Sequence, residues 1–180
     1  MHVAPRHHYT LDDYFAVEEG SPLKHEYWRG SILAMAGGTI GHNRIVRNVL
    51  VALATRLRGG PCEPFGSDMR VATPGGLYTY PDVVVVCGPT QLARGDTLKN
   101  PALLVEVLSP STRDYDRGDK LALYQEIASL REVLFVEPDD ASVERLVRGE
   151  GGWDRTRHTD DAVNLEAGNV SVPVGELFAP

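Results

Sequence analysis

Apolar side chains recur at helical spacing in three parts of the chain. Residues 39–57 carry an apolar residue at every fourth position, which predicts an amphipathic helix. Residues 10–20 read as a shorter helix, because Thr10 can cap it and two aspartates follow in its first turn. Residues 119–130 predict a third helix with one inward apolar face.

Strand-like runs occupy most of the remaining chain. One predicted hairpin turns at Arg29-Gly30. Further apolar runs predict single strands, separated by polar loops at 88–100 and 109–118. The predicted strands lie within residues 64–71, 77–87, 101–108, 132–158 (two or three strands) and 169–178. Helices at both ends of a mixed sheet indicate the α/β or α+β class.

Length and composition indicate one globular domain spanning residues 1–180. The chain has 180 residues, of which 42% are hydrophobic, enough for a full core. No run of apolar residues is long enough to span a membrane, and the first ten residues lack the apolar segment of a signal peptide. The two cysteines, Cys62 and Cys87, imply no disulfide framework. We therefore expect a cytoplasmic protein in a reducing setting, without a membrane partner.

The formal net charge of −7 argues against broad, non-specific coating of nucleic acid. It does not exclude an enzyme that acts on nucleic acid, because a cluster of carboxylates can hold metal ions. The charge alone therefore leaves the function open.

A glutamate stands inside the most apolar strand, in the stretch "LLVEVLSPS". Glu106 shares a face of this strand with Leu104 and Leu108. An ionised carboxylate in such a place costs several kcal/mol unless another group pairs with it. Glu106 is therefore expected to have a buried partner.

A second acid begins another apolar strand, in "YPDVVVVC". If the two strands are neighbours, Asp82 and Glu106 stand side by side, and a bridging cation such as Mg²⁺ would relieve their repulsion. Taken singly, Asp82 could cap a turn and Glu106 could pair with an arginine. The two acids together favour a metal site.

Two further residues are candidates for the same site. Lys120 heads the apolar face of the helix predicted at 119–130, so its ammonium group could reach the carboxylates, although it could also extend to solvent. Glu26 lies on the predicted hairpin, where a single glutamate more often faces solvent.

The stretches "YPDVVVV" and "NPALLVEVLSPSTRDYDRGDKLALYQEIASLREVLFVEPD" resemble the Uma-type family of proposed endonucleases. This family was long described as a domain of unknown function. It is placed in the PD-(D/E)XK restriction-endonuclease-like superfamily. The resemblance is close from Tyr80 to Asp139 and looser over the hairpin and the helix near His42. It implies a restriction-endonuclease-like fold, a mixed sheet flanked by helices.

The resemblance also implies a set of site residues. Asp82 and Glu106 would be the metal-binding acids, and the backbone carbonyl of Val107 a further ligand. Leu108 stands where the plain pattern has lysine, so the lysine of this family would be Lys120. Glu26 would match an additional acid of many superfamily members. The implied cofactor is Mg²⁺ or Mn²⁺.

The implied chemistry is metal-dependent hydrolysis of phosphodiester bonds, with DNA as the expected nucleic acid, although no residue separates DNA from RNA. Candidate phosphate contacts are Arg44, Arg47, Arg113 and Arg117. A homodimer is expected by analogy with related nucleases, because closed dimers are the commonest assembly.

Other functions stay open on the sequence alone. The chain has no GxSxG, Walker or HExxH motif. His42 could face the cleft but is not expected to be a ligand. The main alternative is a nuclease-like fold that serves as a binding or regulatory module with weak or no catalysis. Hydrolysis of another phosphate ester by the same site is a third possibility.

Overall fold

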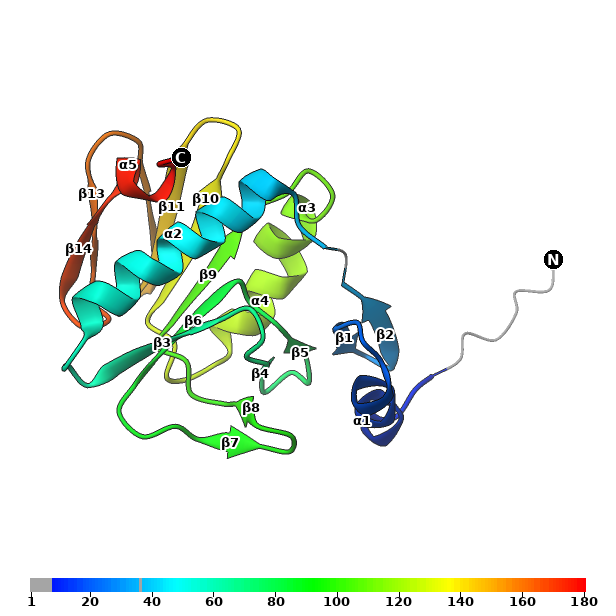
Figure 1. The fold of residues 1–180 in the computed structure, drawn as a ribbon. Helices are drawn as coiled ribbons and strands as arrows, with labels where there is room; N and C mark the ends of the chain where they lie inside the picture. The colour runs from blue at the N-terminus through cyan, green and yellow to red at the C-terminus, as the bar shows by residue number, and fades with distance from the viewer. Residues whose placement is uncertain (1–7, 36) are drawn as a thin grey trace.

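The computed structural model describes residues 8–35 and 37–180 and contains two six-stranded mixed sheets and one two-stranded sheet (Figure 1). Residues 1–7, which make up most of the N-terminal segment predicted not to be a signal peptide, lie outside the described part. Among the described residues, no helix has both the length and the apolar character needed to cross a membrane.

The helices are α1 (Leu11–Gly20), α2 (Ile40–Leu57), α3 (Arg113–Tyr115), the π-helical segment η1 (Asp116–Lys120), α4 (Leu121–Gln125) and α5 (Val174–Leu177). The strands are β1 (His25–Trp28), β2 (Ser31–Ala34), β3 (Cys62–Gly66), β4 (Val71–Ala72), β5 (Tyr78–Thr79), β6 (Val83–Cys87), β7 (Leu92–Ala93), β8 (Thr97–Leu98), β9 (Leu103–Val107), β10 (Glu132–Glu137), β11 (Ser142–Gly149), β12 (Gly152–His158), β13 (Ala162–Leu165) and β14 (Val170–Pro173).

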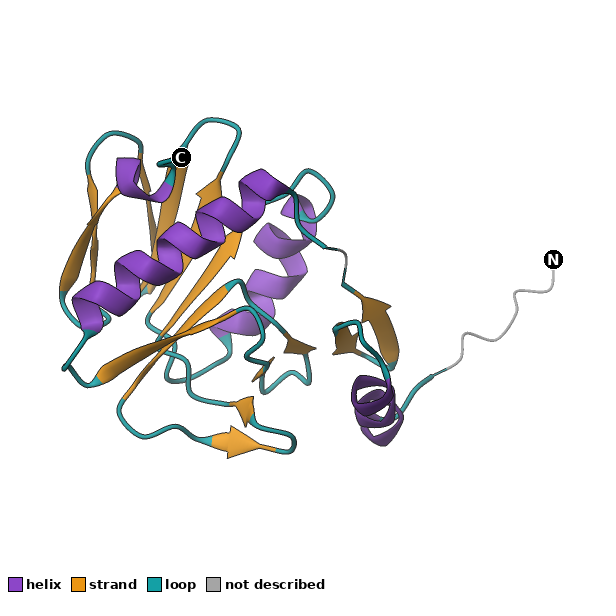
Figure 2. Ribbon diagram, in the orientation of Figure 1, coloured by secondary structure: helices purple, strands orange, loops and turns teal. Residues whose placement is uncertain are grey.

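The central sheet has the strand order β12-β11-β10-β9-β6-β3, and β9 and β10 run parallel at its middle (Figure 2). Successive residues of β9 and β6 enter two different hydrophobic clusters, one on each face of the sheet. Both strands are therefore covered on both sides, which explains their continuous apolar sequences. Leu104 and Leu108 belong to the cluster on the α4 side, and Glu106 between them faces the same way.

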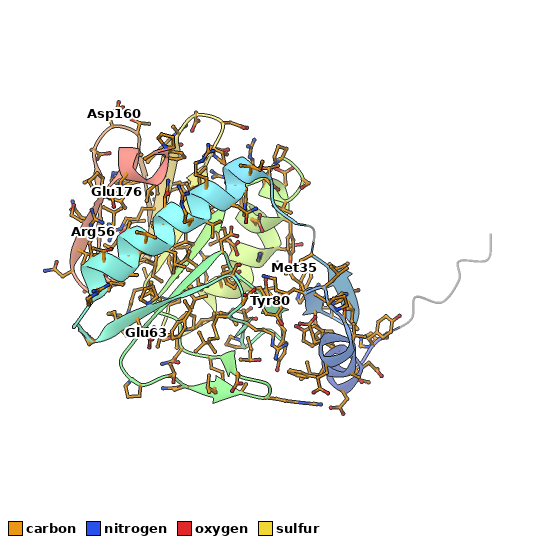
Figure 3. All side chains as sticks on the ribbon, in the orientation of Figure 1. Met35, Arg56, Glu63, Tyr80, Asp160 and Glu176 are labelled. Carbon is orange, nitrogen blue, oxygen red and sulfur yellow. A yellow bond between two sulfur atoms is a disulfide. The ribbon has the colours of Figure 1, made fainter. Side chains whose placement is uncertain are left out.

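Helix α2 covers the opposite face of the central sheet (Figure 1). Its N-cap Thr39 accepts a hydrogen bond from the backbone N–H of His42, as expected for a capping threonine. Its apolar stripe packs on the sheet together with β13, β14 and α5. At its C-terminal end Arg56 forms an ion pair of 2.5 Å with Glu176 of α5 (Figure 3). The helix predicted at 39–57 is confirmed.

The hairpin sheet has the order β2-β1-β5-β4-β8-β7 and includes the predicted hairpin. Arg29 and Gly30 have φ of 49° and 78°, so both lie in the left-handed region that a two-residue hairpin turn requires. Helix α1 packs beside this hairpin, and its N-cap Thr10 forms a capping box with Asp13. The predicted turn and the predicted first helix are both confirmed.

The helix predicted at 119–130 is wrong in its bounds. Helical structure begins at Arg113, inside the segment expected to be a loop, and ends at Gln125. Its middle, Asp116–Lys120, is π-helical. A π turn breaks the 3.6-residue period on which the prediction rested, which is why the pattern started one turn late. The expected loop at 88–100 also contains the short strands β7 and β8.

The two cysteines form a disulfide, which corrects the interpretation from the sequence that they imply none and removes its support for a reducing setting. Cys62 of β3 pairs directly with Cys87 of β6 in the antiparallel ladder, and their sulfur atoms are bonded. The cysteines lie 25 positions apart, and no spacing motif brings them together in the sequence. Only the pairing of β3 with β6 makes them neighbours.

Candidate active site

A cleft of about 850 Å³ opens between the β1–β2 hairpin and the N-terminal end of α2. Its floor is formed by Asp82 directly before β6, by the end of β9 and by the helical segment that follows β9. Met35 and Tyr80 both line the cleft and lie where the hairpin approaches the central sheet (Figure 3). All four predicted catalytic residues line this cleft: Glu26, Asp82, Glu106 and Lys120.

Asp82 and Glu106 stand opposite each other on adjacent strands. Val83 pairs with Val105 in the antiparallel β6–β9 ladder, so the next residues outward along this ladder are these two acids. Asp82 Oδ2 also accepts the backbone N–H of Val107 at 2.7 Å. The sequence analysis assumed that these two strands are neighbours. The β6–β9 pairing is present, and it brings the carboxylates of Asp82 and Glu106 to the same end of the two strands.

Lys120 is buried among three carboxylates. Its Nζ lies 3.0 Å from Glu106 Oε1, 3.1 Å from Glu26 Oε1 and 3.3 Å from Asp116 Oδ1. Only 4% of Lys120 is exposed, and 5% of Glu106. An ammonium group has three N–H donors, and three carboxylates surround this one. Lys120 is thus the buried partner that Glu106 needed.

Glu26 lies in the cluster rather than in solvent. The hairpin carries it over the floor of the cleft, where it is 7% exposed and accepts a short hydrogen bond from the hydroxyl of Thr79. Its pairing with Lys120 joins the hairpin sheet to the helical segment after β9. The site is therefore assembled from both large sheets.

Burial raises the pKa of Glu106 to about 8, although Lys120 opposes this shift. Burial lowers the pKa of Lys120, but the surrounding acidic groups, Glu106 first among them, raise it well above its usual value. Lys120 therefore stays charged at neutral pH. The hydroxyl of Tyr124 donates to Glu106 Oε1 at 2.6 Å, the same oxygen that faces Lys120.

His42 approaches the two acids' strands from the first turn of α2. Its Nε2 lies 3.1 Å from the carbonyl oxygen of Val107 and 3.4 Å from Asp82 Oδ2. Both oxygens accept hydrogen bonds, so Nε2 is the protonated nitrogen here. The hydrogen bond to Asp82 raises the pKa of His42, against the effect of burial.

Residues 11–172 match the Uma2 family, described as "Putative restriction endonuclease". The chain belongs to this family. The resemblance predicted from the sequence is thereby confirmed. Two uncharacterized proteins of Synechocystis sp. are similar to this Uma2 protein. One, slr1290, is 35% identical over 178 residues, covering 97% of this chain and 94% of its own. The other, sll1609, is 30% identical and covers 87% of this chain and 91% of its own.

A solved structure shares the fold of this Uma2 protein. It is the crystal structure of a putative nuclease belonging to DUF820 from Anabaena variabilis, with a TM-score of 0.75. The match covers 94% of this chain and 97% of that chain, at 17% sequence identity. Identity this low shows a common mixed α/β fold and nothing more about the site.

Asp116 and Tyr124 are the site residues that sequence reasoning missed. Asp116 fell in a predicted loop, and Tyr124 fell in the helix predicted at 119–130 without being predicted as a site residue. A signal was present, because Asp116, Lys120 and Tyr124 are spaced four residues apart. The pattern became readable only once the helix was known to begin at Arg113.

Of the four candidate phosphate contacts, Arg44 is best placed. It lines the cleft, is exposed, and has no ion pair or hydrogen bond within the described residues. Arg113 is paired with Glu137 and Asp139. The other two are also engaged: Arg117 with Glu144 and Arg47 with its neighbour Asn48.

The oxygen donors of the site fit a hard divalent ion. In the described part of the chain, no group of three or more histidine, cysteine, aspartate or glutamate side chains is arranged to hold a metal. Mg²⁺ commonly takes only one or two carboxylates and completes its shell with water and phosphate oxygens. Asp82, Glu106 and the Val107 carbonyl offer this kind of donor set. Four carboxylates, those of Glu26, Asp82, Glu106 and Asp116, also lie beside the single ammonium group of Lys120, and this excess of negative charge favours a further cation.

Proposed function

We propose that this protein is a metal-dependent endonuclease that hydrolyses phosphodiester bonds of nucleic acid, with DNA as the expected substrate. The proposal assigns it a restriction-endonuclease-like fold within its Uma2 family. One observation carries it: Asp82, Glu106, Glu26 and Lys120 converge on the floor of one open cleft. A purely structural ion-pair cluster would have no need of a cleft beside it.

In this proposal Asp82, Glu106 and the Val107 carbonyl hold Mg²⁺ or Mn²⁺. The ion, when bound, activates water and neutralises charge on the phosphate. Lys120 keeps the crowded carboxylates in place and adds a positive charge beside the reacting phosphate. His42 fixes the orientation of Asp82 and of the Val107 carbonyl through its hydrogen bonds.

The substrate approaches, in this proposal, along the open side of the cleft. Arg44 contacts a backbone phosphate next to the one that is cut. The protein acts as a homodimer in the cytoplasm. The homodimer rests on analogy with related nucleases and the cytoplasmic location on the sequence, and both are independent of the cleavage chemistry.

The test is cleavage of supercoiled plasmid and of single-stranded DNA and RNA by the purified protein. Each substrate is incubated with Mg²⁺, Mn²⁺ or EDTA. Asp82→Asn and Lys120→Met are compared with Asp160→Asn, an exposed aspartate far along the chain from the cleft residues (Figure 3). We expect metal-dependent cutting that both site variants lose and the control variant keeps.

Cutting that survives both site substitutions would assign the activity to a contaminant or to another site. A folded wild-type protein that cuts none of the substrates would overturn the endonuclease proposal. It would favour the binding or regulatory module instead, which retention of a labelled nucleic acid without cleavage would then identify.

A further inference from the structure

Three cluster residues lie on one stripe of the helical segment that follows β9. Asp116, Lys120 and Tyr124 are spaced by four residues and are all buried. In a regular α-helix each step of four residues overshoots a full turn by about 40°, so the first and third residues would diverge by about 80°. For Asp116, Lys120 and Tyr124 to lie on one face, the helix must therefore depart from regular α-helical geometry between them.

The π turn supplies this change. Residues Asp116–Lys120 are π-helical and Leu121–Gln125 are α-helical. A π turn contains more residues than an α turn, so its four-residue step falls short of a full turn and offsets the overshoot of the next step. Lys120 and Tyr124 then both reach Glu106, and Asp116 reaches Lys120. Single π turns of this kind are common at functional sites.

The contacts of this stripe with Glu106 are made to one carboxylate oxygen, Oε1. Lys120 Nζ and the hydroxyl of Tyr124 both bind Oε1, at 3.0 Å and 2.6 Å. Among the described residues, the side-chain hydrogen bond to Glu106 goes to Oε1 and not to Oε2. Asp116 in turn binds Lys120 from behind at 3.3 Å, so the ammonium group is fixed by Asp116 and Glu26 as well as by Glu106.

We propose that Asp116 and Tyr124 are positioning residues, which fix Lys120 and Glu106 so that the second carboxylate oxygen of Glu106 is presented to the cleft. This inference rests on the proposed function for its effect on cleavage, but its effect on the orientation of Lys120 does not depend on that function. Groups that hydrogen-bond a metal-binding carboxylate commonly change affinity or activity by 10- to 100-fold when removed.

The chain offers a direct reporter of this arrangement, because it contains only three lysines, Lys24, Lys99 and Lys120. In protein labelled with ¹⁵N-lysine, the side-chain ammonium signal of Lys120 is identified by its absence from Lys120→Arg. Because Lys120 is buried among three carboxylates, this signal should exchange slowly with water. Tyr124→Phe and Asp116→Asn should each shift it and speed its exchange, in metal-free buffer.

Two matched variants serve as controls. Tyr78→Phe removes a hydroxyl from a tyrosine that packs among the aromatic rings of α1 and β1, and Asp119→Asn neutralises an exposed acid next to Lys120. Both should leave the signal unchanged. In the cleavage assay, the two positioning variants should lower kcat at least about tenfold with little change in KM for nucleic acid. The controls should keep the wild-type kcat.

An unchanged Lys120 signal in both positioning variants would overturn the inference, as would an unchanged kcat in an active protein. Tyr124→Phe removes a single oxygen atom, so it keeps the test available if Asp116→Asn does not fold. If the wild type cuts no substrate but the signal changes as expected, the endonuclease proposal fails and the positioning of Lys120 stands.

Discussion

At the scale of single residues, Lys120 balances carboxylates from three separate elements. Glu26 comes from β1, Glu106 from β9 and Asp116 from the π turn. Breaking a buried ion pair by removing one partner is strongly destabilising, because the remaining charge is buried without compensation. Lys120→Met should therefore lower the free energy of unfolding by about 3 kcal/mol in EDTA.

Urea denaturation with and without Mg²⁺ measures this effect. Since a bound cation can replace the missing ammonium charge, Mg²⁺ should stabilise Lys120→Met more than the wild type. Lys99→Met, at an exposed lysine, should change the unfolding free energy by less than about 0.5 kcal/mol. Equal losses in the two variants would contradict the role given to Lys120.

Arg44 should contribute to nucleic-acid binding through a phosphate contact. Because Arg44 lines the cleft and has no ion-pair partner in the part of the chain that the structure describes, Arg44→Ala should weaken binding several-fold and reduce the dependence of log affinity on log salt by about one unit. Fluorescence anisotropy of a labelled oligonucleotide at several salt concentrations measures both. Arg47→Ala, one turn further along α2 and bonded to Asn48, is the matched control. The prediction is wrong if both variants bind alike.

At the scale of elements, the N-terminus of α2 positions a wall of the site. Thr39 accepts the backbone N–H of His42, the residue that contacts both Asp82 and Val107. Loss of such a cap typically costs about 1 kcal/mol. Thr39→Ala should lower the unfolding free energy by this amount in urea denaturation, whereas Thr55→Ala, exposed in the same helix, should be neutral or slightly stabilising. Equal effects would show that the cap contributes nothing.

Elements with a regular period were predictable, and the site between them was only partly so. The α2 period, the Arg29-Gly30 turn and the apolar runs of β6 and β9 follow from local sequence. The start of helical structure at Arg113 did not, because the π turn shifts the apolar period there. Glu106 stood out because it interrupts an apolar run, and Asp82 because it begins one. Asp116 lies in a polar stretch, where a further carboxylate gives no contrast.

At the scale of the whole molecule, the site depends on contacts between parts that are distant in sequence. Glu26 belongs to the hairpin sheet and Lys120 to the helical segment after β9, and only the approach of the hairpin to the central sheet joins them. Burial on both faces explains why Asp82 and Glu106 could be paired from sequence: two such strands are neighbours in a small central sheet. The position of the hairpin has no comparable local cause, so Glu26 was the least secure of the four candidates.

The disulfide is a second link of this long-range kind, and its contribution is measurable. It closes a loop of 25 residues that carries β4, β5 and Asp82 between β3 and β6. Closing a loop of this length reduces the entropy of the unfolded chain and should stabilise the fold by about 3 kcal/mol. Urea denaturation of the oxidised protein and of Cys62→Ser/Cys87→Ser measures this difference. Reductant should lower the unfolding free energy of the wild type and leave that of the double variant unchanged.

In a reducing cytoplasm the two cysteines would be unbonded thiols. The reduced protein should therefore keep the β3–β6 ladder and the placement of Asp82, because the five residue pairs of that ladder and the hydrophobic cluster beneath it do not require the bond. Loss of metal-dependent cleavage on reduction, with the fold intact, would contradict this and would tie the activity to an oxidising setting.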